Sequence, residues 1–164
     1  MTMTLRPFAI AALLSLALPL AGCNRAPAPV PAVAPTESAP GNAATATLDG
    51  ITLEARLVNT ATLGAAMARQ YGILQADDRW LLLITLRDAE GNAVPADAVK
   101  LDARAGGMTD APAPVALKPI TVNGLTDLVG SVQAKAPTTL RIEIDAARGG
   151  STAQMRFSRD LPAL

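Results

Sequence analysis

Residues 79–87 read RWLLLITLR, and the rest of the domain can be ordered around them. Successive side chains of a β-strand point to opposite faces, so this segment would be apolar on both sides. One face would carry Trp80, Leu82, Ile84 and Leu86, and the other would carry Leu81 and Leu83. A strand that is apolar on both faces belongs in the interior of a protein. We therefore expect residues 79–87 to form a central strand.

Alternation with a period of two recurs on both sides of this strand, and turn residues separate the repeats. Pro119 interrupts one segment, which favours an edge strand, and Asn123-Gly124 is typical of a type I′ hairpin turn. Seven short strands at this spacing predict a mainly β fold, an antiparallel immunoglobulin-like sandwich. The strands are expected near residues 51–57, 79–87, 99–105, 115–122, 126–134, 140–145 and 152–157.

One segment between the first two strands departs from this alternation. Residues 61–71 are rich in alanine, Asn59 or Thr60 can cap their start, and Gly72 follows where a left-handed residue often ends a helix. We expect a short helix here, crossing an open end of the sandwich. Its inner face would carry Leu63, Met67 and Tyr71.

The N-terminus has the layout of a secretory signal. Arg6 precedes an apolar run over residues 8–20, which is shorter than the about 20 residues of a membrane-spanning helix. The tetrapeptide Leu20-Ala21-Gly22-Cys23 resembles the lipobox of bacterial lipoproteins. This resemblance implies cleavage between Gly22 and Cys23 and lipidation of Cys23. An ordinary signal cut elsewhere and an uncleaved anchor are the alternatives.

Asn24 follows the cysteine where inner-membrane lipoproteins often carry Asp. The resemblance therefore implies an anchor in the outer membrane, on the periplasmic face. Two or more acyl chains give lasting attachment, whereas a single chain holds a protein only marginally. Cys23 is the single cysteine, so no intramolecular disulfide can form.

The sequence divides into three parts: a signal peptide over residues 1–22, a linker over 23–46 and a sandwich domain over 47–164. The linker consists mostly of Ala, Pro, Val, Thr and Gly, and such a chain cannot build a helix or a strand ladder. We expect a disordered tether that lifts the domain away from the lipid surface. Its prolines are Pro27, Pro29, Pro31, Pro35 and Pro40.

Most of the domain also resembles a family of secreted proteins of Gram-negative bacteria, known only as a domain of unknown function with an immunoglobulin-like sandwich. The resemblance implies the fold and carries no activity. It rests on Ala68-Arg69-Gln70-Tyr71-Gly72-Ile73, on residues 78–86, on Val94-Pro95-Ala96 and on Met155-Arg156-Phe157.

The composition argues against most catalytic chemistry. The chain has no histidine, which removes Ser-His-Asp and Cys-His nucleophiles and most zinc and copper sites. Met67, Met108 and Met155 could offer sulfur to Cu(I), but methionine more often fills gaps in a core. Asp88, Glu90 and Asn92 lack the ligand pattern of a calcium loop. We expect no catalytic residue, no metal and no cofactor.

Formal charge is balanced, with 14 basic and 14 acidic residues, so no nucleic-acid partner is expected. The best candidate for a partner surface is Tyr71, Gly72, Asp77, Asp78 and Arg79. Alternatively, Tyr71 plugs the end of the core and Arg79 pairs with a neighbouring acid. The sequence thus predicts a non-enzymatic module, lipid-anchored and facing an envelope protein partner. The alternative is a periplasmic protein that handles a small ligand or a metal.

Overall fold

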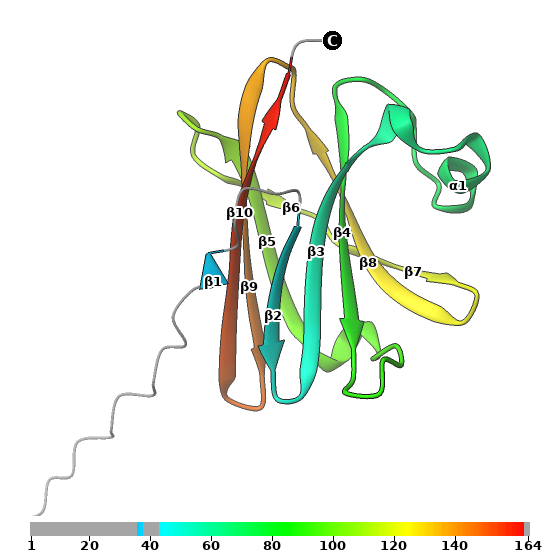
Figure 1. Ribbon diagram of the computed structural model, residues 1–164, viewed down its shortest axis with the longest axis vertical. Helices are drawn as coiled ribbons and strands as arrows, with labels where there is room; N and C mark the ends of the chain where they lie inside the picture. Colours follow the sequence, from blue (N-terminus) through cyan, green and yellow to red (C-terminus); the bar gives the residue numbers. More distant parts are fainter. Residues whose placement is uncertain (1–35, 38–42, 163–164) are drawn as a thin grey trace, which may run out of the picture. The chain divides into compact units, whose positions relative to one another are not determined.

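Two five-stranded sheets face each other in the computed structural model, which describes residues 36–37 and 43–162 (Figure 1). All of them belong to the second of the chain's two units, residues 31–164. Neighbouring strands are antiparallel, except that β1 runs parallel to β10. Sheet A has the order β1 (Thr36–Glu37), β10 (Ser151–Leu161), β9 (Thr138–Arg148), β5 (Lys100–Gly107), β6 (Ala113–Val115). Sheet B has the order β2 (Ala43–Leu48), β3 (Ile51–Asn59), β4 (Arg79–Arg87), β8 (Leu125–Gln133), β7 (Lys118–Val122).

The expected antiparallel sandwich is confirmed, and residues 79–87 form β4 in the middle of sheet B. Side chains from both sheets fill the space between them, because alternate residues of each long strand point inward. Strand β4 contributes Trp80, Leu82, Ile84 and Leu86, all at most 5% exposed. Facing them from sheet A are Ile142, Ile144, Met155 and Phe157, all buried.

Ten strands replace the expected seven in the described part of the chain. Two of the additions lie in residues 23–46, where the sequence predicted a disordered linker: β1, and the first four residues of β2. Strand β2 alternates like the others, with Ala44 and Leu48 buried in the core. Asp49-Gly50, both with positive φ, then close a hairpin to β3. The folded domain therefore begins before residue 47.

The expected fourth strand is in fact two strands in different sheets. β6 pairs with β5 and β7 pairs with β8, so the chain changes sheet at Ala116–Leu117. Gly130 makes room for this crossing, because a Cβ there would lie 2.5 Å from Val115 Cγ1. As expected, Pro119 lies in an edge strand, and Asn123-Gly124 form the β7–β8 turn with positive φ at both residues.

The single helix predicted over residues 61–71 is two short helices. η1 (Thr60–Thr62) is capped by Asn59, and α1 (Ala65–Gln70) begins after Leu63 and Gly64, which are extended. A second 3-10 helix, η2 (Ala96–Ala98), precedes β5. In Figure 1, α1 projects to one side of the domain, beyond sheet B, and does not pass over the space between the sheets, so the expected crossing of an open end is wrong. Ala68 is buried, whereas Met67 is 47% exposed, so the helix buries a different face from the one expected.

The signal residues, with Gly22 and Cys23, and the linker prolines lie outside the described residues. Within the described part of the chain, no helix is long and apolar enough to cross a membrane.

Candidate functional site

A hollow of about 330 Å³ lies on the outer face of sheet B, and we call it the outer groove. Its lining comes from three places: the segment after α1, the outer face of β4 and β8, and the start of β7. The side chains and backbone that line it belong to Thr60, Tyr71, Gly72, Ile73, Leu74, Arg79, Trp80, Leu81, Ala116, Lys118, Val129, Gly130 and Ser131.

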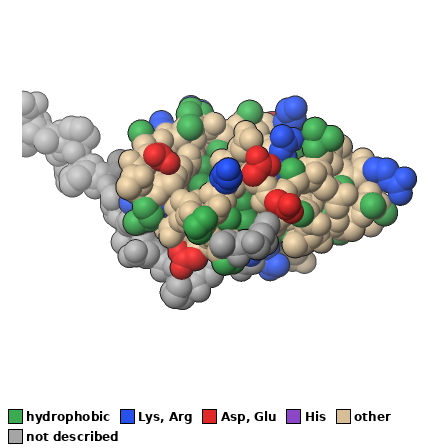
Figure 2. Space-filling model, turned by 90° about the horizontal axis from the view of Figure 1, so that it is seen from above, with side chains coloured by type: hydrophobic (Ala, Val, Ile, Leu, Met, Phe, Trp, Pro, Cys, Tyr) green, Lys and Arg blue, Asp and Glu red, His purple; other side chains and the backbone are tan. Residues whose placement is uncertain are grey.

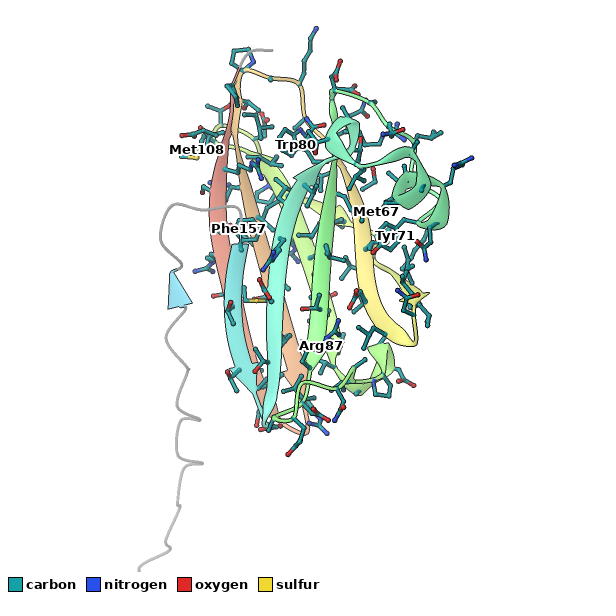
Figure 3. The ribbon with its side chains drawn as sticks, turned by 45° about the vertical axis from the view of Figure 1, so that its right-hand side comes forward. Met67, Tyr71, Trp80, Arg87, Met108 and Phe157 are labelled. Atoms are coloured by element: carbon teal, nitrogen blue, oxygen red, sulfur yellow. The ribbon has the colours of Figure 1, made fainter. Side chains whose placement is uncertain are left out.

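The end of α1 directs the chain along this groove. The N–H of Ile73 donates to Ala68 O at 2.8 Å and that of Gly72 donates to Arg69 O at 3.2 Å. Gly72 has a φ of +62°, and this combination is a Schellman motif, in which a left-handed residue reverses the chain. Tyr71 and Ile73, the residues before and after Gly72, both line the groove. Figure 3 shows Tyr71 below α1 on this side of the domain.

Buried Thr60 holds the segment that leads from the groove into β4. Its Oγ1 accepts from the N–H of Ala76 at 3.0 Å and lies 3.0 Å from the carbonyl oxygens of Ala76 and Arg79, so it can donate to either. Gln75 Nε2 also donates to the carbonyl of Leu63. These bonds join the segment after α1 to the residues that follow β3, and they fix the position at which Arg79 enters β4.

The floor of the groove is apolar. Leu81 is 3% and Val129 is 7% exposed, although both point away from the core between the sheets. Covered by the segment after α1, they form a second, smaller apolar cluster on the outside of sheet B. Leu74 at the rim is 71% exposed, which makes it a large apolar side chain open to solvent.

The charged residues of the groove are both basic. Among the described residues, neither Arg79 nor Lys118 forms an ion pair. On the same face of sheet B, by contrast, Arg87 Nη2 lies 2.7 Å from Asp127 Oδ1 and Arg56 pairs with Glu54. Figure 2 shows hydrophobic side chains next to basic ones at the end of the domain where α1 lies in Figure 1.

The structure brings Tyr71, Gly72 and Arg79 together in the groove, as the predicted partner surface required, but leaves Asp77 and Asp78 out of its lining. The carboxylate of Asp78 accepts instead from Gln133 Nε2 at 3.0 Å, and the backbone carbonyl of Asp77 accepts from Asn59 Nδ2. Within the described residues, Arg79 has no acidic partner, and Tyr71 lies outside the inter-sheet core.

Sequence reasoning missed Leu81, Val129 and Lys118 as groove residues. An available signal was the second apolar face of β4, which needs something to cover it. Nothing in the local sequence around Lys118 places it beside Val129; only the β7–β8 register does.

The described residues also form other hollows. One lies over the outer face of sheet A, where Lys100, Asp102, Asp145 and Gln154 surround Ala146 and Ala147. No group of three acidic, histidine or cysteine residues that could hold a metal occurs in the described part of the chain. Met155 is buried in the core, and Figure 3 shows Met67 and Met108 on opposite sides of the domain.

The fold and the groove together define a small antiparallel β-sandwich domain with one apolar, basic-rimmed hollow outside its core. The family model described as "Domain of unknown function (DUF4426)" matches residues 45–162, so the chain belongs to that family. No match was found among curated proteins.

Two solved structures show the same fold. A DUF4426 family protein from Pseudomonas aeruginosa PAO1 aligns with a TM-score of 0.60 and 12% identity, over 75% of this chain and 97% of that one. A copper-bound variant of FetP from uropathogenic Escherichia coli strain F11 aligns with a TM-score of 0.51 and 10% identity, over 73% of this chain and 95% of that one.

Proposed function

We propose that this protein is a non-enzymatic interaction module of the bacterial envelope that binds a partner protein through the outer groove. The observation that carries the proposal is the exposed apolar rim next to unpaired charges. Leu74 is 71% exposed beside a hollow whose basic residues, Arg79 and Lys118, form no ion pair among the described residues. Aromatic and apolar side chains beside arginine are the composition of interface cores.

The envelope location is proposed from the sequence of the N-terminus. Leu20-Ala21-Gly22-Cys23 matches the lipobox at every position, so we propose a lipid on Cys23 and an anchor in the outer membrane on its periplasmic face. The proline-rich residues that follow would give the domain reach from the lipid surface, at about 3.1 Å per residue where extended. A module that binds a partner in the periplasm needs an anchor and a binding face.

Site-specific photo-crosslinking in intact cells tests the binding face. A photoreactive amino acid at Leu74 is expected to give a discrete adduct with a protein. The same amino acid at Ser158, an exposed residue on the opposite sheet, is the matched control and should give none. Equal adducts at both positions, or none at Leu74, would refute the groove as the binding face.

Metabolic labelling with a palmitate analogue tests the anchor. Wild-type protein should take up the label, and Cys23→Ala should not. Labelling that persists in Cys23→Ala would contradict the proposed lipid on Cys23. It would not affect the proposal that the groove is the binding face.

Metal handling is the second candidate, and the observation that favours it is the copper in the FetP variant. This chain lacks histidine, and the three methionines of its described residues are dispersed: Met67 lies in α1, Met108 follows β5, and Met155 lies in the core. We therefore expect added Cu⁺ to leave the thermal unfolding midpoint unchanged, because a ligand stabilises only a state that binds it. A concentration-dependent rise in the midpoint would favour the metal candidate instead.

A further inference from the structure

The outer groove can recognise a ligand through charge and through apolar contact, and the residues for each lie at different places in the groove. Lys118 pairs with Val129 and Arg79 pairs with Gln133, so the two basic residues flank β8 positions that lie four residues apart. At about 3.4 Å per residue this is roughly 14 Å. Between them lie Leu81 and Ser131, which are directly paired. The groove therefore has a basic residue towards each end, and its large apolar residue open to solvent is Leu74 at the rim.

Neither basic residue is neutralised within the described part of the chain. The carboxylate of Asp78, which precedes Arg79 in the sequence, accepts a hydrogen bond from Gln133, and the outward-facing Asp127 is paired with Arg87. A ligand with acidic groups would supply the missing charge at a site that also removes apolar surface from water. Complementary charge of this kind fixes register and selects partners.

We infer that the partner presents a short peptide segment in which acidic side chains flank apolar ones. This inference rests on the proposed function and specifies the chemistry of its partner. About four extended residues would span the two basic ends, with an apolar side chain against Leu74, the large apolar residue of the groove that is open to solvent at 71% exposure. A volume of about 330 Å³ is at the small end of ligand pockets and suits a few side chains of a peptide.

Selection of random dodecapeptides displayed on phage against the full-length protein in detergent tests the inference. Enriched peptides should combine Asp or Glu with Leu, Ile, Val or Phe. A synthetic peptide from the selection should bind on the order of tenfold more weakly to an Arg79→Glu/Lys118→Glu variant, as expected for removal of complementary charge. Selection on that variant should enrich Lys and Arg instead.

The matched control reverses two basic residues on the outer face of sheet A, Lys100→Glu and Arg104→Glu. Both are exposed, so this variant has the same change in net charge, and it should bind the peptide like wild type. Circular dichroism melts of both variants confirm that they are folded before binding is compared.

The failures of the two proposals differ. A specific crosslink at Leu74 together with selected peptides that lack an acidic excess would overturn the inference and leave the proposed function standing. No crosslink and no enriched peptide would overturn both. Vesicles containing phosphatidylglycerol that compete with the selected peptide, or bind with the same dependence on Arg79 and Lys118, would assign the groove to a lipid surface and overturn the inference.

Discussion

Thr60 illustrates how one side chain can set the position of a binding face. It is the buried polar residue among those described, at 1% exposure. Its hydroxyl forms hydrogen bonds with the backbone of Ala76 and Arg79. Because these backbone groups approach from a segment 16 to 19 residues away, the hydroxyl fastens the chain just beyond the β3–β4 ladder, whose last pair is Asn59 with Trp80.

Thr60→Val should therefore destabilise the domain by about 1–3 kcal/mol, since it leaves buried donors and acceptors unpaired at almost constant volume. Urea unfolding followed by the fluorescence of Trp80, the single tryptophan, measures this. Thr60→Ser keeps the hydroxyl and should lose much less. A loss in Thr60→Ser at least as large as that in Thr60→Val would show that the methyl group matters as much as the hydrogen bonds.

Arg159 is an unusual inward-facing residue of β10, between buried Phe157 and Leu161. Its Nη1 donates to Leu57 O at 2.7 Å, and its guanidinium carbon lies 5.0 Å from the centre of the Trp80 ring. The side chain thus joins sheet A to sheet B.

We expect Arg159→Met, which keeps an unbranched stem, to cost about 1–2 kcal/mol through the lost hydrogen bond and cation–π contact. The emission spectrum of Trp80 should change as well, because a charge beside the indole is removed. An unaltered spectrum would argue that the guanidinium does not lie over the ring in solution.

Asp88 gives a pH-dependent readout of a single turn. Its carboxylate accepts from the side chain and backbone N–H of Asn92 and from the N–H of Glu90, and these bonds, led by the Asn92 side chain, hold the pKa of Asp88 below its ordinary 3.8. Since the folded-state pKa is the lower one, the stabilisation is present above pH 3.8 and is lost as pH falls through the folded value. A carbon-13 titration of the carboxyl group should give a midpoint below 3.8, and Asn92→Ala should raise it. A midpoint at or above 3.8 in the wild type would contradict this account.

At the scale of elements, the end of α1 depends on one glycine. Gly72 has a φ of +62° and nothing lies within 4 Å of an added Cβ, so a substitution there tests backbone conformation alone. Gly64, before the helix, is equally open but has an ordinary φ of −60°.

Gly72→Ala should destabilise by about 1 kcal/mol and speed amide exchange over α1, because L residues other than Asn and Asp rarely adopt this conformation. Gly64→Ala should cost less, because Gly64 has an ordinary φ and only its place as the N-cap of α1 disfavours alanine. Unfolding free energies of the two variants, measured side by side, give the comparison. Similar effects at both positions would refute a role for the left-handed conformation.

Most strands were predictable because each long strand buries one face, which imposes a period of two on its residues. β4 was predicted to the residue, and the cores of β3, β8, β9 and β10 were predicted within a few residues. β2 was missed because small Ala and Thr residues give weak contrast between faces. The helix was displaced because Leu63-Gly64 adopt an extended conformation that alanine-rich composition did not reveal.

At the scale of the molecule, the two sheets are linked by a crossing that needs space. The chain passes from β6 in sheet A to β7 in sheet B over Gly130, where an added Cβ would lie 2.5 Å from Val115 Cγ1 and 3.2 Å from Leu117 Cδ2.

Gly130→Ala should therefore cost about 1–3 kcal/mol by overpacking. Val115→Ala in the same chain should restore part of that loss, because it removes the methyl group that the new Cβ meets. Thermal or urea unfolding of the single and double variants measures the coupling. Strictly additive losses would show that the two residues do not compete for space.

The amino-acid sequence alone determined the sandwich class, the central strand, the Asn123-Gly124 turn and the left-handed Gly72. Each of these depends on residues that are close together in the sequence and that favour one backbone conformation. The same patterns nominated Tyr71 and Arg79. The folded arrangement was needed to show that these two share a groove with Lys118 and Val129, and that Arg79 has no acidic partner among the described residues. Such neighbours depend on strand register and on the path of the chain between sheets, and both are set by packing across many residues.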